Sequence, residues 1–228
     1  MSWAEVFKIN SNMKRPLNEQ LRDMKFRPMR IITATGTYTP EKTGKYMVIC
    51  VGAGGEGSAR ATSTSQYGSS GGGGGVAVKT LTLSKSTAYN VTVGTTASFT
   101  FNASTIITAT SGNSSSSTGG TGGTASGGDS NYTGTSGSST SYDFTAPMGG
   151  SVGVAISELT RSPAPVFTTL TYESGESTPV TLQHGDCILN YGGGGTGAYM
   201  YNGSSDSQTY KTTGKSAAVI IVPLEMEE

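Results

Sequence analysis

Residues 52–57, Gly-Ala-Gly-Gly-Glu-Gly, form the sharpest apparent enzyme motif, because they match the pattern G-x-G-x-x-G and follow the strand-like run 46–51. In a dinucleotide site such glycines let the backbone approach a pyrophosphate at the start of a helix, and an acidic residue about 20 positions later binds the ribose. Here residues 58–66 offer no apolar helical face, and the position expected to be acidic falls within the glycine run 71–75. We therefore expect no nucleotide at this motif.

Hydrolytic chemistry would have to use His184, the only histidine of the chain, together with its neighbours Asp186 and Cys187. Neighbours along an extended chain point to opposite faces, so these side chains do not form a proton relay. A glycosidase needs a pair of carboxylates, and no pattern brings the candidates together: Glu158, Glu173 and Glu176. One His and two distant Cys also fall short of the ligand set of a zinc site. We expect no catalytic residue, no metal and no cofactor.

Recognition chemistry is the more natural expectation for the tyrosines that lie among Gly and Ser residues. A Tyr on such a background supplies rigid contact area and a hydroxyl at low entropic cost, which is typical of loops that bind a sugar or a protein surface. Tyr67 and Tyr132 lie deep in loop-like sequence and are expected to be exposed, whereas Tyr199 and Tyr201 share one strand face and could equally belong to the core. The candidate receptor-binding residues are Tyr67, Tyr132, Tyr142, Tyr199, Tyr201, Asn113 and Asn131.

The elements that would position these side chains are β-strands, because apolar residues alternate with a period of two from Arg30 onward. Strand-like runs cover residues 31–39, 45–51, 76–83, 88–93, 98–110, 152–156, 166–171, 179–183, 187–191, 198–201 and 217–223. The first two are predicted to form a hairpin through the turn 40–44. Many short strands separated by turns indicate an all-β sandwich or barrel rather than a βαβ fold.

The composition excludes several other classes of protein. The chain of 228 residues contains 34 Gly, 31 Ser and 34 Thr, which disfavours a helical bundle. Its net charge of zero leaves no basic surface for nucleic acid, and no apolar run reaches the roughly 18 residues that a membrane-spanning helix needs. Cys50 and Cys187 lie in apolar runs and are expected to be buried free thiols. The N-terminus lacks the layout of a secretory signal, so we expect synthesis in the cytosol without insertion into a membrane.

The blocks rich in Gly, Ser and Thr allow two interpretations. They could be flexible linkers or variable loops, expected at about 56–75, 111–141 and 192–214, and 111–141 fits a linker best. Alternatively, extended glycine strands with a threefold repeat could pack side by side, since backbones without side chains can approach closely. In that case 71–75, 119–128 and 192–195 would form the packed part.

The first 30 residues form a segment of different composition, followed by a glycine-rich β domain over 31–228. They contain seven Lys and Arg against three acidic residues, and no Gly between Ser2 and Met29. Leu17, Leu21 and Met24 follow Pro16 with helical spacing and predict a short amphipathic helix over 16–24. This helix could cap the domain, dock onto a partner or pack against copies of itself.

The opening run 7–21, Phe-Lys-Ile-Asn-Ser-Asn-Met-Lys-Arg-Pro-Leu-Asn-Glu-Gln-Leu, resembles the N-terminal segment of tail proteins from phages and prophages of Gram-positive bacteria. The body resembles the glycine-rich domain of phage tail fibre and adhesin proteins. This likeness lies in an ordered set of motifs at 36–40, 51–55, 75–83, 89–94 and 217–222. The glycine runs are shorter than in that family and are diluted with Ser and Thr, which favours an ordinary β-sandwich over a packed lattice.

The resemblance implies a non-enzymatic protein of the virion tail, assembled in the cytoplasm of the bacterial host, that binds the host surface. Such adhesins are often homotrimers. By this resemblance the loops would bind a host glycan or envelope protein, and the N-terminal segment would attach to other tail or baseplate proteins through Arg15, Leu17, Leu21 and Met24. The alternative is a purely structural baseplate, tail-tip or fibre-connector protein.

Overall fold

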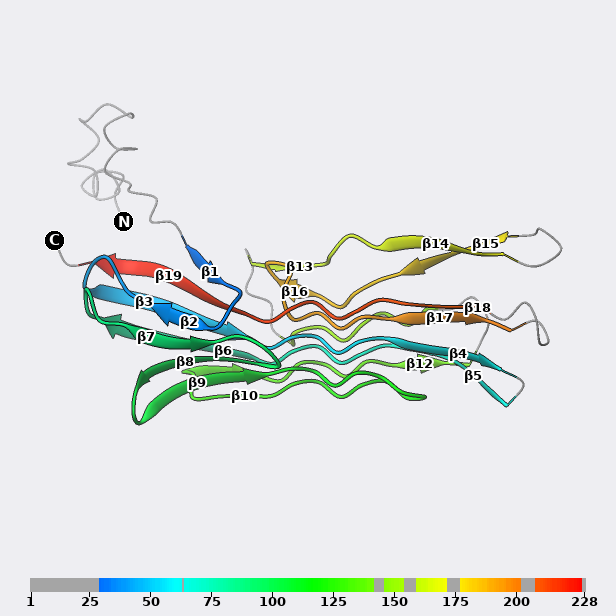
Figure 1. The fold of residues 1–228 in the computed structure, drawn as a ribbon, viewed down its shortest axis with the longest axis horizontal. Helices are drawn as coiled ribbons and strands as arrows, with labels where there is room; N and C mark the ends of the chain where they lie inside the picture. The colour runs from blue at the N-terminus through cyan, green and yellow to red at the C-terminus, as the bar shows by residue number, and fades with distance from the viewer. Residues whose placement is uncertain are drawn as a thin grey trace, which may run out of the picture.

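The computed structural model describes residues 29–226 apart from positions 63, 142–145, 154–158, 172–176 and 202–207. The described part is elongated and consists of strands and irregular segments without a helix (Figure 1). A β-sandwich lies at one end together with the first and last described residues, wavy segments run side by side through the middle, and short hairpins lie at the far end. The all-β prediction is confirmed. The helix expected over 16–24 lies outside the described residues.

Two five-stranded sheets form the sandwich. The first has the order β1-β19-β3-β6-β11 and contains β1 (Arg30–Ile32), β19 (Ala218–Met226), β3 (Gly44–Val51), β6 (Val76–Leu83) and β11 (Ser130–Tyr132). The second has the order β10-β9-β8-β7-β2 and contains β10 (Ala125–Ser126), β9 (Thr105–Thr110), β8 (Thr96–Asn102), β7 (Tyr89–Thr92) and β2 (Gly36–Tyr38). Every pairing in the two sheets is antiparallel.

The period of two in the sequence divides the first sheet into two apolar faces. On β3, Val48 and Cys50 face the second sheet and join its aromatic residues in the main core, whereas Ile49 and Val51 point to the other face and form a second cluster. In the main core Tyr89 stacks on Phe99, with ring centroids 5.6 Å apart. The first sheet is therefore buried on both faces over much of its length.

The hairpin predicted between residues 31–39 and 45–51 is wrong. Residues 31–39 split into β1 and β2, which belong to different sheets, and β3 instead pairs with β19 and β6. The closing strand β19 is nine residues long and inserts between β1 and β3, so a local hairpin gives way to a pairing between distant parts of the chain.

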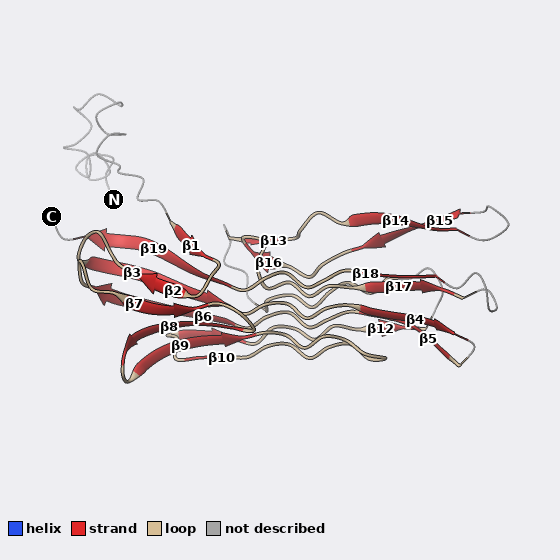
Figure 2. Ribbon diagram, in the orientation of Figure 1, coloured by secondary structure: helices blue, strands red, loops and turns tan. Residues whose placement is uncertain are grey.

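The middle of the molecule is built from segments that lie side by side without forming strands (Figure 2). Backbone hydrogen bonds of 2.7–3.1 Å join them. We call this region the glycine lattice, and it comprises residues 52–57, 70–75, 111–115, 119–124, 133–138, 149–152, 183–186, 192–196 and 212–216.

The run 71–75 lies at the centre of the lattice and repeats every three residues. Its N–H groups donate to three neighbouring segments in turn: Gly71 and Gly74 to Gly195 and Gly192, Gly72 and Gly75 to Asn113 and Thr110, and Gly73 to Thr135. The carbonyl groups of 70–75 accept N–H groups from three further segments, 52–57, 119–124 and 149–152. A repeat of three with hydrogen bonds in several directions is the polyproline II conformation built from glycine, whereas a β-strand bonds only to neighbours in one sheet.

Glycine is required in this run because neighbouring backbones occupy the space of a side chain. A Cβ added at Gly72 would lie 2.0 Å from the carbonyl oxygen of Thr121, and one added at Gly73 would lie 2.0 Å from that of Ser151. Both distances are far inside van der Waals contact. The packed glycine arrangement that the sequence left open is thus present at 71–75, 119–124 and 192–195, while residues 125–126 form β10.

The linker interpretation of 111–141 is wrong for most of that range. Residues 111–115, 119–124 and 133–138 are lattice segments, and 130–132 are β11. Side chains add bonds along their outer edge, where Asn113 Nδ2 donates to Thr121 Oγ1 at 2.7 Å. The ranges 56–75 and 192–214, expected as loops, likewise contain the lattice segments 70–75 and 192–196.

Beyond the lattice the chain forms short strands again. A three-stranded sheet has the order β12-β5-β4, with β12 (Ser139–Thr140), β5 (Ser65–Ser69) and β4 (Ser58–Thr62). Two hairpins are β14 (Val166–Thr171) with β15 (Ser177–Leu182) and β17 (Gly197–Met200) with β18 (Gln208–Lys211). A small pair, β13 (Thr160–Arg161) and β16 (Cys187–Ile188), lies nearer the sandwich, where Ile188 joins the second apolar cluster.

Candidate functional site

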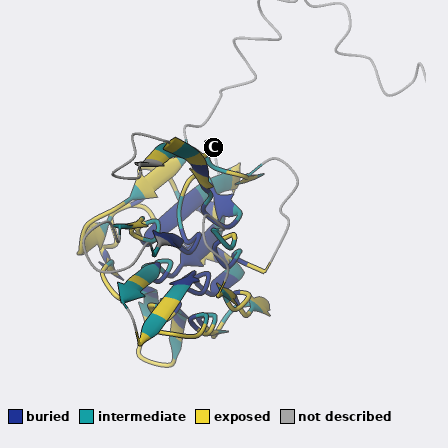
Figure 3. Ribbon diagram, turned by 90° about the vertical axis from the view of Figure 1, so that its right-hand side faces the viewer, coloured by how far each residue is buried: buried dark blue, intermediate teal, exposed yellow. Residues whose placement is uncertain are grey.

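The sheet β12-β5-β4 and the hairpins β14–β15 and β17–β18 lie together at the end farthest from the sandwich (Figure 1). We call these three units the distal hairpins. Strand β17 contacts β4, β5 and β15, so the units pack against one another. Seen end-on, buried backbone lies at the centre of the molecule and exposed residues lie around it (Figure 3).

The hairpin β14–β15 has one face buried and one face open. Val180 and Leu182 are buried and pack with Ala198 of β17 in a small apolar cluster. On the opposite face Phe167 is paired with Thr181 and is 77% exposed, the highest value among the large apolar residues described as exposed. Thr169 and Pro179 are the next pair on that face and are also exposed. An aromatic ring flanked by hydroxyls, with no charged side chain in the described parts of either strand, can contact a sugar ring or a neutral protein surface.

The hairpin β17–β18 places one tyrosine inside and one outside. Tyr199 is fully buried, and its hydroxyl donates a hydrogen bond of 2.5 Å to the carbonyl oxygen of Ser141. Tyr210 lies on β18, where it is paired with Ala198 of β17, and is 40% exposed. Tyr210 therefore offers a second aromatic surface among the distal hairpins.

The distal hairpins carry few charged side chains in the described residues, namely Arg60 on β4 and Lys211 on β18. Tyr67 is half-buried on β5 and is paired with exposed Arg60 of β4. Lys211 at the end of β18 forms a salt bridge of 2.5 Å with Glu56, where the lattice passes into β4. Because this pair neutralises itself, the distal hairpins present a largely uncharged surface in the described residues.

The receptor-binding residues predicted from the sequence do not form one site. Tyr67 lies among the distal hairpins, and half-buried Tyr201 follows β17. Tyr199 is fully buried and belongs to the core, so no part of its side chain is exposed to a ligand. The rest of the described candidates lie elsewhere: Tyr132 and Asn131 on β11 of the sandwich, and Asn113 in the lattice. Tyr142 lies outside the described residues, as do Arg15, Leu17, Leu21 and Met24 of the attachment segment.

Tyr132 differs from its expected exposure for a clear reason. It is half-buried and packs against the second apolar cluster, because β11 pairs with β6 and turns this side chain onto the outer face of the first sheet. Asn131 is exposed but is held by the local turn, where its Nδ2 donates to the carbonyl oxygen of Gly128 at 3.1 Å.

Sequence reasoning missed Phe167, the most exposed aromatic side chain among the described residues of the distal hairpins. The run Val166-Phe-Thr-Thr was recognised as a strand, but a Phe in a strand is ordinarily assigned to the core. The signal that could have found it is the partner strand, in which Val180 and Leu182 already supply the buried face and leave Phe167 on the other.

The structure places the apparent catalytic motifs in backbone roles. The motif 52–57 is a lattice segment in which Gly54 donates to the carbonyl of Lys215 at 2.8 Å, and it is followed by strand β4 rather than a helix. The Nε2 atom of His184 donates to the carbonyl oxygen of Thr213 at 2.9 Å, while Asp186 accepts a hydrogen bond of 2.5 Å from Ser162. Burial lowers the pKa of His184, so the ring is neutral near pH 7.

The described residues hold no cluster of three or more His, Cys, Asp or Glu side chains that could bind a metal ion. Cys50 and Cys187 are free and buried, as predicted. In the described part of the chain no helix is both long and apolar enough to cross a membrane.

Comparison with known proteins gives one match. Residues 33–220 fit the family model described as a glycine-rich domain, a range that covers the lattice, the distal hairpins and the sandwich apart from β1 and the end of β19. A search of curated proteins finds no match.

Proposed function

The chain belongs to the family of glycine-rich domains, and from its architecture we propose that it is a non-enzymatic phage or prophage tail protein that attaches the virion to the bacterial surface. In this proposal the distal hairpins bind a host glycan or envelope protein. The opposite end, with the segment 1–30, attaches to other proteins of the tail or baseplate.

The observation that carries the proposal is the separation of the two ends by the lattice. Strands β1 and β19, which contain or adjoin the first and last described residues, lie at the sandwich end, and the distal hairpins lie at the other (Figure 1). Each lattice segment is bonded to neighbours by its backbone, and interiors packed this closely do not deform easily. A rigid middle of this kind would hold a binding surface at a fixed distance from the particle.

The chemistry of the distal hairpins supports a neutral ligand. Phe167, Tyr210 and Tyr67 supply aromatic surface, and Thr169 and Thr181 place hydroxyls beside Phe167. Contacts of this kind are individually weak. In the proposed homotrimer, simultaneous engagement of several copies would multiply them through effective concentration.

The test replaces side chains rather than loops, because a deletion within 111–141 would remove lattice segments along with any loop. Particles would be assembled with the variant Phe167→Ala, and adsorption to the host strain would be measured. Loss of an aromatic contact at the centre of a binding surface costs about 2 kcal/mol, so single-site affinity should fall by more than about tenfold. The matched control is Ile106→Ala, which removes a side chain that is 47% exposed on β9 of the sandwich.

Normal adsorption of particles that carry Phe167→Ala together with Tyr210→Ala would contradict the proposed role of the distal hairpins. If these particles also assembled normally, while truncation of residues 1–28 prevented incorporation of the protein, the structural alternative would be favoured. In that case the protein would be a baseplate, tail-tip or fibre-connector component.

A further inference from the structure

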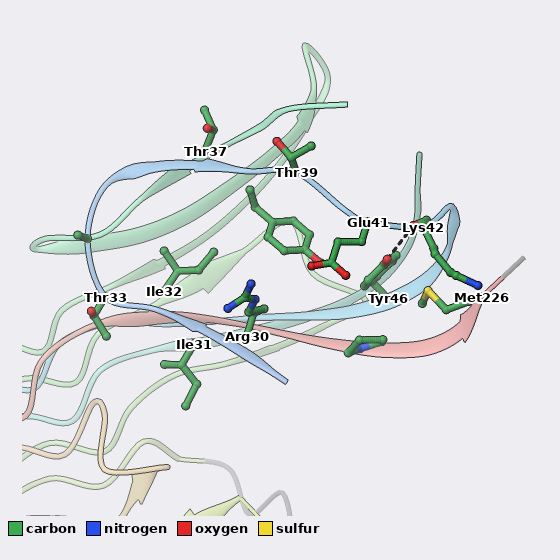
Figure 4. A pocket seen from close by; sticks show the side chains of 13 residues that line it. Arg30, Ile31, Ile32, Thr33, Thr37, Thr39, Glu41, Lys42, Tyr46 and Met226 are labelled. Carbon is green, nitrogen blue, oxygen red and sulfur yellow. Dashed lines mark hydrogen bonds between the residues drawn. The ribbon is translucent and has the colours of Figure 1, made fainter. Parts of the chain in front are cut away.

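A cavity of about 820 Å³ lies at the sandwich end, where the two sheets part between their edge strands β1 and β2. Arg30, Ile32 and Glu41 point into the space beside Tyr46 and Met226 (Figure 4). Its size falls within the range of cavities that hold a ligand or a short piece of chain.

The wall of the cavity is apolar core that the fold leaves partly open. The rings of Tyr38 and Tyr46 meet edge to face with centroids 6.3 Å apart, and the Tyr46 hydroxyl donates to the carbonyl oxygen of Lys42 at 2.8 Å. Ile32, Tyr38 and Met226 pack against the main core yet are only half-buried. Apolar surface left open beside a core is a place where another element of structure packs.

We propose that this cavity receives the segment 16–24 of the same chain, with Leu17, Leu21 and Met24 against Ile32, Tyr38 and Met226. This inference concerns the sandwich end and does not rest on the proposed function. In a helix those three side chains lie on one face, about 10 Å from first to last at a rise of about 1.5 Å per residue. Docking of an amphipathic helix into an apolar groove is a common mode of recognition.

The position of the first described residues supports this occupant. The chain enters the described structure at Met29, and Arg30, the next residue, already lines the cavity. Four residues separate Met24 from Met29, and an extended chain spans at most about 3.5 Å per residue, so the segment can reach no farther than about 17 Å from Met29. The cavity, which begins at Arg30, therefore lies within reach of the segment.

The charges at the cavity do not select the occupant, so its apolar surface must do so. Arg30 and Lys42 line the cavity together with Glu41, and Glu225 at the same end of the sandwich is paired with Lys45 at 2.9 Å. Residues 1–28 contain six Lys and Arg against three acidic residues. The segment would therefore dock by its apolar face, with its basic residues directed away from the cavity.

The test uses trypsin on the full chain, since the segment carries its own cleavage sites. A docked helix should protect the bond after Arg22, whereas the bond after Lys8 lies outside the segment and reports general access. In the wild-type protein we expect cleavage after Arg22 to be several-fold slower than cleavage after Lys8. Met226→Lys, which places a charge in the cavity, should abolish the difference, and the matched control Leu224→Lys, on an exposed residue of the same strand, should keep it.

Leu21→Asp changes only the segment and should also abolish the protection, so the test stands even if Met226→Lys fails to fold. Equal cleavage after Arg22 and Lys8 in the wild-type protein would overturn the proposal. Protection that survives both Met226→Lys and Leu21→Asp would overturn it as well. Protection that grows with protein concentration would show that the segment docks on another copy, and this result would overturn docking within one chain.

Discussion

Gly73→Ala adds a single methyl group to the centre of the lattice and should destabilise the protein more than a substitution of this size usually does. The new Cβ would lie 2.0 Å from the carbonyl oxygen of Ser151 and 2.8 Å from that of Gly150. Both contacts are to backbone, which cannot rotate away as a side chain can. The backbone conformation of this residue is not left-handed, so the expected cost comes from packing rather than from dihedral strain.

The size of the effect follows from what must move. Inserting atoms into a packed core costs about 1–3 kcal/mol. Gly73 also donates to the carbonyl of Thr135 at 2.9 Å and accepts from the N–H of Gly123 at 2.8 Å. Displacing this segment would weaken both hydrogen bonds, each with a net contribution of about 1 kcal/mol. We expect a loss of about 4 kcal/mol in the free energy of unfolding, or about 8–16 °C in Tm for a chain of this size.

The measurement is denaturant and thermal unfolding followed by circular dichroism, with Gly36→Ala as the matched control. Nothing lies within 4 Å of a Cβ added at Gly36, which is exposed on β2. That substitution should leave stability unchanged or raise it by about 0.4–1 kcal/mol, because it restricts the unfolded chain. If Gly73→Ala lowered stability by no more than Gly36→Ala does, the backbones would not be packed as closely as the lattice requires.

Two further predictions concern buried titratable groups. Burial lowers the pKa of His184, so the folded protein binds fewer protons at this residue than the unfolded chain does. The contribution of the neutral ring to stability should be complete above about pH 6.5 and should be lost as the pH falls toward the lower pKa of the folded state. The free energy of unfolding of His184→Gln should therefore depend less on pH over this range, and an unchanged pH dependence would show that another group is responsible. Burial raises the pKa of the Cys50 thiol to about 12 and that of Cys187 to about 11, so both should resist a thiol reagent near pH 8 until the protein is unfolded. Rapid labelling in the native state would show local opening, of the sandwich core for Cys50 on β3 or of the β13–β16 pair for Cys187.

The strands were predictable because their signal is local. Alternation at 45–51, 76–83 and 217–223 identified the three long strands of the first sheet, which carry both apolar clusters. Their pairing was less predictable. Strand β19 lies between β1 and β3 although more than 160 residues separate it from β3, and a nearby turn at 40–44 suggested a hairpin instead.

The lattice was only half predictable, because a glycine-rich linker and a glycine-rich lattice share one composition. What distinguishes them is a period of three, which is visible at 119–124 as Gly-Gly-Thr-Gly-Gly-Thr. Thr121 and Thr124 are exposed, while Gly120 and Gly123, each directly before one of these threonines, are buried and donate to the carbonyl oxygens of Ser70 and Gly73. The run 71–75 shows no period of three in its sequence, because it is buried on all sides and every position is Gly.

The candidate site was predicted least well, and the reason is physical. A tyrosine among Gly and Ser residues signals contact area, but it does not reveal whether the contact is internal or external. Tyr199 and Tyr210 have similar surroundings in sequence, yet one donates to Ser141 from the interior and the other is exposed. Ala198 and Tyr199 are both fully buried, so β17 is covered on both faces, whereas the partner strand β18 is largely exposed and leaves Tyr210 open.

A lattice held together by backbone hydrogen bonds separates the residues that stabilise the fold from those of the proposed binding surface. Its bonds depend on glycine where segments meet, as at Gly72 and Gly73, and make no demand on residues that point away from neighbouring segments. The strands of the distal hairpins leave this framework at positions that the lattice itself fixes, so a change on their open faces, such as at Phe167, removes no lattice bond. Variation in binding should therefore be possible at little cost in folding, provided that the buried faces with Val180, Leu182 and Ala198 are kept.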